Sequence, residues 1–220
     1  MSLKTTFRFL KELKKNNTRE WMHAHQEDFK SAKNETIELV SVLLKGMKPL
    51  HPSFPEIPPE SCFFRIHRDV RFSKNKAPYK TNMGVALNLY GRKSYRPGFY
   101  LHLEPGGVFL AAGMFQPAPD VLGLVRAEID FQAADFLKVL HKKAFQQRVS
   151  SLWQDDKLVK VPKGFDADSP VAEYLKLKSF IASVAYTDAE TNSPDFPKQL
   201  LKDMKILWPF ILFLDQPLNH

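Results

Sequence analysis

Hydrophobic and polar positions change their period along the chain. In the first third, apolar residues recur every three or four positions, which is typical of amphipathic helices. This spacing predicts a short helix over Thr6–Lys15 and a long one over Thr18–Gly46. Asn17 is the expected N-cap of the long helix, because Glu20 follows three residues later as in a capping box. The proline-rich stretch His51–Pro59 ends this helical part.

The middle of the chain alternates apolar and polar residues instead, as half-buried strands do. Four segments alternate in this way: Cys62–Phe72, Val85–Leu89, Phe99–Leu103 and Val108–Phe115. In the first segment the apolar side is expected to carry Phe64, Ile66, Val70 and Phe72. Short turns join the last three segments, so we expect them to form an antiparallel meander.

Helical spacing returns in the last part of the chain. It predicts helices over Pro119–Phe131 and Ala133–Leu152, a strand over Ser179–Tyr186, and a final helix from about Ser193 that Pro209 should kink or end. Helices, then strands, then helices favour an α+β fold, here an antiparallel sheet with helices packed on one face. We expect a single compact domain over residues 1–220. Its helical N-terminal part covers about 1–48, its sheet-rich core about 60–116 and its helical C-terminal part about 118–214.

Composition places the chain among ordinary globular proteins. Cys62 is the single cysteine, so no internal disulfide can form, and this favours a reducing compartment. No stretch is long and apolar enough to span a bilayer, and the N-terminus lacks the pattern of a signal peptide. We therefore expect a cytoplasmic protein with no membrane partner.

The net charge of +8 changes this picture because it is concentrated in one window. Between Arg65 and Arg96 there are nine Lys or Arg residues and one acid, Asp69, whereas the rest of the chain has 23 basic and 23 acidic residues. A local cationic surface attracts phosphates, nucleic acids and other anions. The alternative is a solvated face that only aids solubility.

Within this window, residues 65–80 carry the most informative side chains. Arginine offers a planar fork of donors for two phosphate or carboxylate oxygens, and lysine adds a mobile point charge. The candidate ligand-binding residues are Arg65, Arg68, Asp69, Arg71, Lys76, Tyr79 and Lys80. The plainer interpretation is a set of structural ion pairs, for example between Arg68 and Asp69.

These residues also carry a resemblance. The run Arg65-x-x-Arg68-Asp69-x-Arg71-Phe72, followed by Asn75-Lys76 and Tyr79, resembles the signature of the bacterial family named domain of unknown function 2461 (DUF2461). Further similar residues are Asn16-Asn17 with Trp21, His102 with Glu104-Pro105-Gly106, and Pro162-Lys163-Gly164-Phe165. The resemblance covers nearly the whole chain. It implies no activity, but it supports the arginine-rich segment as the place to look.

Weaker candidates for catalysis are His67, Asp69, His102 and Glu104, which alternate on the polar sides of two predicted strands. If those strands are neighbours, the four side chains could converge as a metal site or act as acids and bases beside a bound phosphate. Because any alternating strand brings i and i+2 together, surface polar residues are the default interpretation. We assign no metal ligand, and no pattern identifies a cofactor. Tyr100 could stack on a base, whereas Phe99 shares the apolar side of its strand.

Three functions remain open at this stage. The first is binding of a phosphate-bearing or other anionic ligand, such as a nucleotide or nucleic-acid end, in an arginine-rich site, with or without chemistry on it. The second is a non-enzymatic structural or protein-interaction role in which the arginines form an ion-pair network. The third is a non-specific nucleic-acid-binding module with steep salt dependence. We favour anion binding and expect the open face of the sheet to display Arg65, His67 and Arg71.

Overall fold

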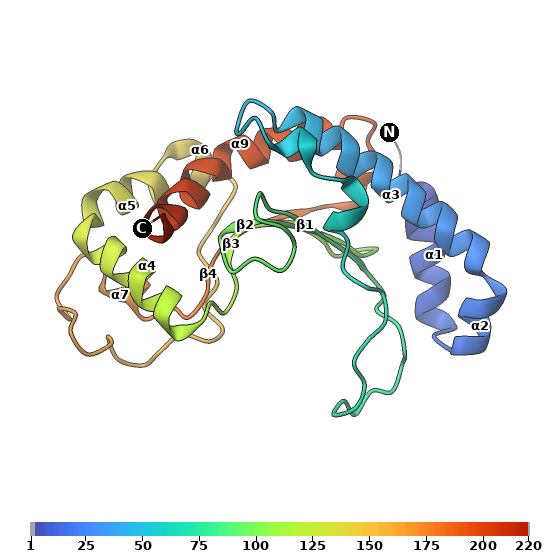
Figure 1. Cartoon of the computed structure of the whole chain (residues 1–220), viewed down its shortest axis with the longest axis horizontal. Helices are drawn as coiled ribbons and strands as arrows, with labels where there is room; N and C mark the ends of the chain where they lie inside the picture. The colour runs from blue at the N-terminus through green and yellow to red at the C-terminus, as the bar shows by residue number, and fades with distance from the viewer. Residues whose placement is uncertain (1–2, 220) are drawn as a thin grey trace. The chain divides into compact units, whose positions relative to one another are not determined.

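The computed structural model describes residues 3–219 and has the α+β fold that the sequence predicts (Figure 1). The N-terminal part consists of α1 (Lys4–Lys15), α2 (Arg19–Ala24), α3 (Gln26–Gly46), η1 (Phe54–Glu56) and η2 (Pro59–Cys62). The first three strands are β1 (Met83–Leu87), β2 (Gly98–Leu103) and β3 (Val108–Met114). The remaining elements are α4 (Pro119–Phe131), α5 (Ala133–Leu140), α6 (Lys143–Gln146), α7 (Ala172–Leu175), β4 (Phe180–Tyr186), α8 (Asp188–Asn192), α9 (Phe196–Asp215) and η3 (Gln216–Leu218).

The four strands form one antiparallel sheet in the order β1-β2-β3-β4. The predicted meander is therefore confirmed, and β4 extends it by pairing beside β3. Antiparallel neighbours need only short connections, which is why the turns between β1, β2 and β3 suffice.

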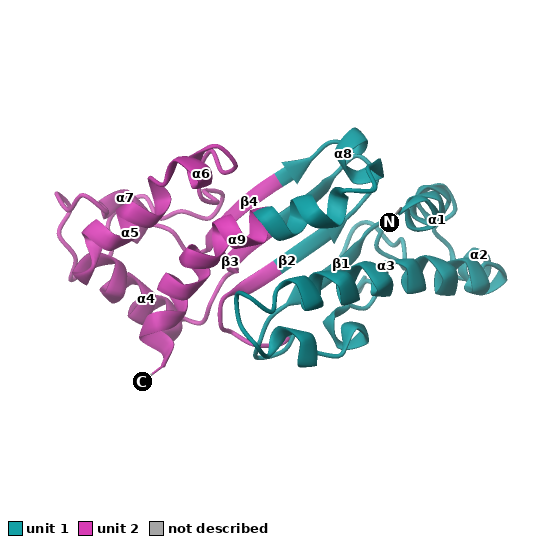
Figure 2. Ribbon diagram, turned by 90° about the horizontal axis from the view of Figure 1, so that it is seen from above, with its two compact units in different colours: residues 1–92, 100–110, 185–202 teal, residues 93–99, 111–184, 203–220 magenta. Residues whose placement is uncertain are grey.

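Contacts divide the chain into two compact units (Figure 2). Unit 1 comprises residues 1–92, 100–110 and 185–202, and unit 2 comprises residues 93–99, 111–184 and 203–220. Strands β2, β3 and β4 and helix α9 each contribute residues to both units.

In unit 1, α1 packs on α3 and α3 packs on β1. The Thr6 backbone N–H and hydroxyl both donate to the Glu35 carboxylate at 2.7 Å, and the Thr36 hydroxyl lies 3.4 Å from the Met83 sulfur. Along β2, Leu101 and Leu103 are completely buried, whereas the residues between them are partly exposed. The sheet of unit 1 thus has one buried face and one open face.

In unit 2, the C-terminal half of α9 packs on strand residues. Trp208 stacks on Phe99, which is only 2% exposed, so the expectation that Phe99 points inward is confirmed. The buried Asp203 carboxylate accepts two hydrogen bonds from the Arg148 guanidinium, at 2.8 and 2.9 Å. This bidentate pair compensates a charge that burial would otherwise penalise.

Several predicted helix boundaries are wrong. The expected Thr18–Gly46 helix is interrupted at His25, and its first turn is capped by Thr18, whose hydroxyl accepts from the Trp21 N–H, rather than by Asn17. The expected Ala133–Leu152 helix is split into α5 and α6. Helix α9 continues through Pro209, so of the two expected effects of this proline, a kink or an end, the end does not occur.

The predicted strand over Cys62–Phe72 is also wrong. After η2 the chain forms only the isolated bridges Phe63–Val85 and His67–Tyr79. Its supposed apolar side does not share a buried face either, because Phe64 is 40% exposed and Phe72 is 96% exposed. Alternating residues form a strand only where the apolar side of the segment packs against another layer of the protein, and no such layer covers Phe72.

Within residues 3–219, no helix combines the length and the apolar character that crossing a bilayer requires.

Candidate functional site

The arginine-rich segment forms an irregular hairpin over residues 63–82, which belongs to unit 1 and extends from β1 as a long loop (Figure 1). Its two arms are joined by backbone hydrogen bonds from Arg68 to Pro78 and from Lys80 to Ile66, at 2.9 and 2.8 Å. Regular pairing is absent between its bridges, so side chains supply much of its internal bonding.

Arg68 and Lys76 hold the hairpin together. The Arg68 guanidinium donates to the Ala77 carbonyl at 3.1 Å and to the Ser73 hydroxyl at 3.3 Å. The Lys76 ammonium donates to the Val70 carbonyl at 3.1 Å. Both cations therefore bond the backbone or side chains of their own loop.

Asp69 and Arg71 form an exposed bidentate pair. The Arg71 guanidinium donates to both Asp69 oxygens, at 3.0 and 2.7 Å. These hydrogen bonds lower the pKa of Asp69 and raise the pKa of Arg71. An exposed ion pair of this kind adds little stability. It does, however, occupy the two N–H groups of Arg71 that could otherwise bind an anion bidentately.

Tyr79 is buried, with 7% of its surface exposed, and anchors the hairpin to the N-terminal helices. The Asn17 side chain receives the Tyr79 backbone N–H and donates to its carbonyl, both at 3.0 Å. The Asn17 amide thus clamps a residue 62 positions away. The Tyr79 ring lies 5.0 Å from the ring of His67.

The structure places several of the candidate residues in roles within the hairpin itself. Arg68, Arg71 and Lys76 are bonded within the hairpin, and Tyr79 is buried. The expectation that Arg65, His67 and Arg71 lie on the open face of the sheet is wrong, because they belong to the hairpin outside the strands.

The open face of unit 1 instead carries a row of rings. The ring of Phe64 meets that of Tyr100 edge-on at 5.9 Å, and Tyr100 lies 5.9 Å from Phe109. The His102 ring stacks on Phe109 at 4.7 Å. We call these four residues the aromatic row.

A chain of hydrogen bonds runs along the same face. The Tyr100 hydroxyl lies 3.1 Å from His102 Nδ1, and His102 Nε2 lies 3.3 Å from Glu104 Oε2. The Thr81 hydroxyl donates to the other Glu104 oxygen at 2.9 Å. A carboxylate accepts only, so Nε2 donates to Glu104, and in the neutral ring Nδ1 then accepts from the Tyr100 hydroxyl. Burial and the Glu104 charge raise the pKa of Tyr100, which keeps its hydroxyl protonated.

Space for Tyr100 comes from Gly84 on the neighbouring strand. A β-carbon built at Gly84 would lie 2.7 Å from the Tyr100 hydroxyl oxygen and 3.0 Å from its Cε2. The glycine is therefore what allows the tyrosine to lie across β1 and reach His102.

Cations surround the Phe64 end of the row. The Lys80 ammonium and the Arg92 guanidinium lie 5.8 and 5.6 Å from the centre of the Phe64 ring. Burial and the nearby charge of Arg65 lower the pKa of Lys80. Arg92 donates one N–H to the Phe63 carbonyl. Within residues 3–219, none of the three cations pairs with a carboxylate.

The weaker candidates separate into two groups. His102 and Glu104 are bonded to each other on β2, whereas His67 and Asp69 lie in the hairpin. Across the described part of the chain, no three His, Cys, Asp or Glu side chains are placed to hold a metal ion. His67 and Asp69 therefore lack the strand positions that a convergence with His102 and Glu104 would have required.

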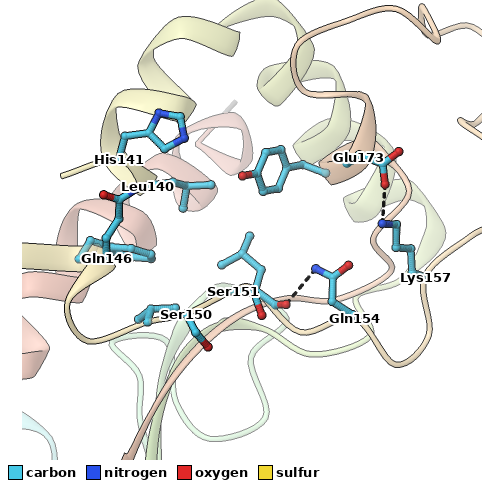
Figure 3. A pocket seen from close by; sticks show the side chains of 12 residues that line it. Leu140, His141, Gln146, Ser150, Ser151, Gln154, Lys157 and Glu173 are labelled. Atoms are coloured by element: carbon cyan, nitrogen blue, oxygen red, sulfur yellow. Dashed lines mark hydrogen bonds and ion pairs between the residues drawn. The ribbon is translucent and has the colours of Figure 1, made fainter. Parts of the chain in front are cut away.

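Unit 2 has a separate surface pocket of about 360 Å³ (Figure 3). Its floor is apolar and includes Leu140 and Leu152, and its rim carries His141 and Gln154. The rim carboxylate of Glu173 is paired with Lys157 and Lys176 at 2.5 Å each, which lowers its pKa to about 2. Because both of these lysines are paired with Glu173, they differ from the cations around Phe64, which have no carboxylate partner within residues 3–219.

Sequence reasoning missed Phe64, Arg92, Phe109 and Gly84. Phe64 was assigned to a buried side, and Arg92 was counted in the basic window without a partner. The alternation in Val108–Met114 places Phe109 on the same face as His102 and could have identified it. By contrast, Arg96 in unit 2 is bonded to Asp215 at 2.6 Å and does not contribute to the cationic cluster.

These features define an α+β protein with a four-stranded antiparallel sheet and an aromatic, cation-flanked open face in unit 1. The profile of the conserved hypothetical protein family DUF2461 matches residues 5–213, so the chain belongs to this family. No curated protein matches the chain. No solved structure matches it either.

Proposed function

We propose that this protein binds a phosphate-bearing anionic ligand on the open face of unit 1, beside Phe64. One observation carries the proposal: Lys80 and Arg92 flank the Phe64 ring without a carboxylate partner in residues 3–219. Cations kept close together repel each other, and a bound phosphate would relieve that repulsion. The pKa of Lys80 is lowered first by burial and then by the charge of Arg65, a third cation near this lysine.

The geometry leaves donors for a ligand. Arg92 uses one N–H for the Phe63 carbonyl, which orients its guanidinium, and an arginine has five N–H donors. Lys80 supplies a second cation, and the Arg65 guanidinium makes no hydrogen bond within residues 3–219. Two or three charge-assisted bonds to one phosphate are therefore available. Arg68, Arg71 and Lys76 serve in the proposal as supports of the hairpin.

The proposal is tested by titrating inorganic phosphate, pyrophosphate and ribose 5-phosphate into the protein, using calorimetry and backbone amide NMR. Lys80→Gln should weaken binding by about 10- to 150-fold, the value of one charge-assisted hydrogen bond. Lys74→Gln is the matched control, because it removes the same charge from an exposed lysine of the same hairpin.

A loss with Lys80→Gln and not with Lys74→Gln would support a defined site. Equal losses in both variants would show that only the overall charge matters, and the proposal would fail. It would also fail if none of the three anions bound to the wild-type protein.

A further inference from the structure

The Phe64 ring beside the two cations indicates more about the ligand than its charge. Phe64 remains 40% exposed although Tyr100, Lys80 and Arg92 all contact it. An aromatic residue that stays partly exposed beside two cations offers a planar molecule a place to stack.

The aromatic row extends this surface across two strands. Phe64 is followed by Tyr100 of β2 and then by Phe109 of β3, with ring centres 5.9 Å apart at both steps. The three atoms nearest to a β-carbon built at Gly84 all belong to Tyr100, so the tyrosine ring itself lies over this part of β1. A flat ring and its phosphate can thus contact the row and the cations at the same time.

We infer that the ligand is a nucleoside monophosphate, with its base stacked on Phe64 beside Tyr100 and its phosphate bound by Lys80 and Arg92. The inference rests on the proposed function and adds the class of ligand to it. Stacking requires only a π-face, so purine and pyrimidine bases should both be accepted.

A single nucleotide fits better than a strand. A strand needs a track of free cations, but Arg68, Arg71 and Lys76 are bonded within the hairpin. On the sheet, Glu104 is one of the polar groups beside His102, and its carboxylate would repel a phosphate backbone that crossed β2. Lys80 and Arg92, which both lie beside the Phe64 ring, match one phosphate group.

The experiment compares AMP, UMP and ribose 5-phosphate by calorimetry at a fixed salt concentration. The two nucleotides should bind at least about tenfold more tightly than the sugar phosphate, since stacking on one aromatic side chain gives this order of discrimination. Phe64→Ala and Phe64→Leu should both abolish the preference while ribose 5-phosphate binding persists. Phe72→Ala is the matched control, because Phe72 is a 96% exposed phenylalanine that contacts Arg71 in the same hairpin.

Each outcome separates the two proposals. Equal affinities for AMP and ribose 5-phosphate would overturn the stacking inference and leave the proposed function standing. A preference that survives in the folded Phe64→Ala protein would place the base elsewhere and overturn it as well. A tetranucleotide that bound more than about tenfold more tightly than AMP would refute the single-nucleotide ligand. If no phosphate compound bound, both proposals would fail.

Discussion

Replacement of Gly84 by alanine tests how the aromatic row is built. The new methyl group would lie 2.7 Å from the Tyr100 hydroxyl oxygen, 3.0 Å from Cε2 and 3.2 Å from Cζ. Ordinary contacts begin at 3.4 Å, so the phenol oxygen must move by about 0.7 Å. That movement strains the 3.1 Å hydrogen bond to His102.

The magnitude follows from two opposing effects. Overpacking of this kind costs about 1–3 kcal/mol, whereas alanine is favoured over glycine in a strand by roughly 0.5–1 kcal/mol. We therefore expect Gly84→Ala to lower the free energy of unfolding by about 1–2 kcal/mol. In a Tyr100→Phe background the closest contact and the hydrogen bond are already gone, so the same change should cost about 0 kcal/mol.

The assay is a double-mutant cycle measured by urea denaturation, with circular dichroism as the signal. A coupling of about 1 kcal/mol or more between the two substitutions is expected. If Gly84→Ala had the same effect with tyrosine and with phenylalanine at position 100, the packing of Tyr100 over Gly84 would be refuted.

Three further predictions concern other parts of the chain. Gly113→Ala should destabilise the protein by more than about 4 kcal/mol in thermal unfolding, because the φ of Gly113 is +127° and a β-carbon there would lie 1.9 Å from the Phe180 carbonyl oxygen. Gly123→Ala, at an open position of α4, should instead stabilise the protein by about 1 kcal/mol. Effects of equal sign in the two variants would contradict the argument. Asn17→Ala should lower the free energy of unfolding by about 1–3 kcal/mol, because two hydrogen bonds to the Tyr79 backbone are lost. The slow hydrogen exchange of the Tyr79 amide should be lost as well. Unchanged exchange at this amide would argue against the clamp. Glu173 should titrate with a pKa of about 2 in carboxyl NMR. The stability from its ion pairs is fully present above about pH 4.5, the ordinary pKa in the unfolded chain, and is lost as the pH falls through about 2. Lys157→Gln should raise the pKa of Glu173, and an unchanged pKa would rule out the pair with Lys157.

Local periodicity was sufficient for much of the fold. The strands β1 to β4 lie where alternation placed them, and α1 lies where helical spacing placed it. In these elements one side meets a packed layer, so that the pattern along the chain and the environment in space agree. The same agreement put Phe99 inward and Tyr100 outward on β2.

Predictions from the hydrophobic pattern failed where contacts distant in the sequence, or their absence, determined the local structure. Residues 63–72 alternate as a strand does, yet Phe64 and Phe72 are exposed and the segment makes only isolated bridges. Helix α9 passes through Pro209, although proline usually ends a helix, and its C-terminal half packs through Trp208 on Phe99. Both cases depend on contacts between residues far apart in the sequence.

Charge and hydrophobic period are local properties, so they could be read along the chain: the excess positive charge lies in one segment, and a meander follows it. The partners of the individual cations depend on the folded chain instead. The tertiary structure bonded Arg68 and Arg71 within the hairpin and brought Lys80 and Arg92 to 5.8 and 5.6 Å from the centre of one phenylalanine ring. A side chain's partner is chosen by distance in space, and an ion pair or a stacked ring leaves no trace in the spacing of residues along the chain.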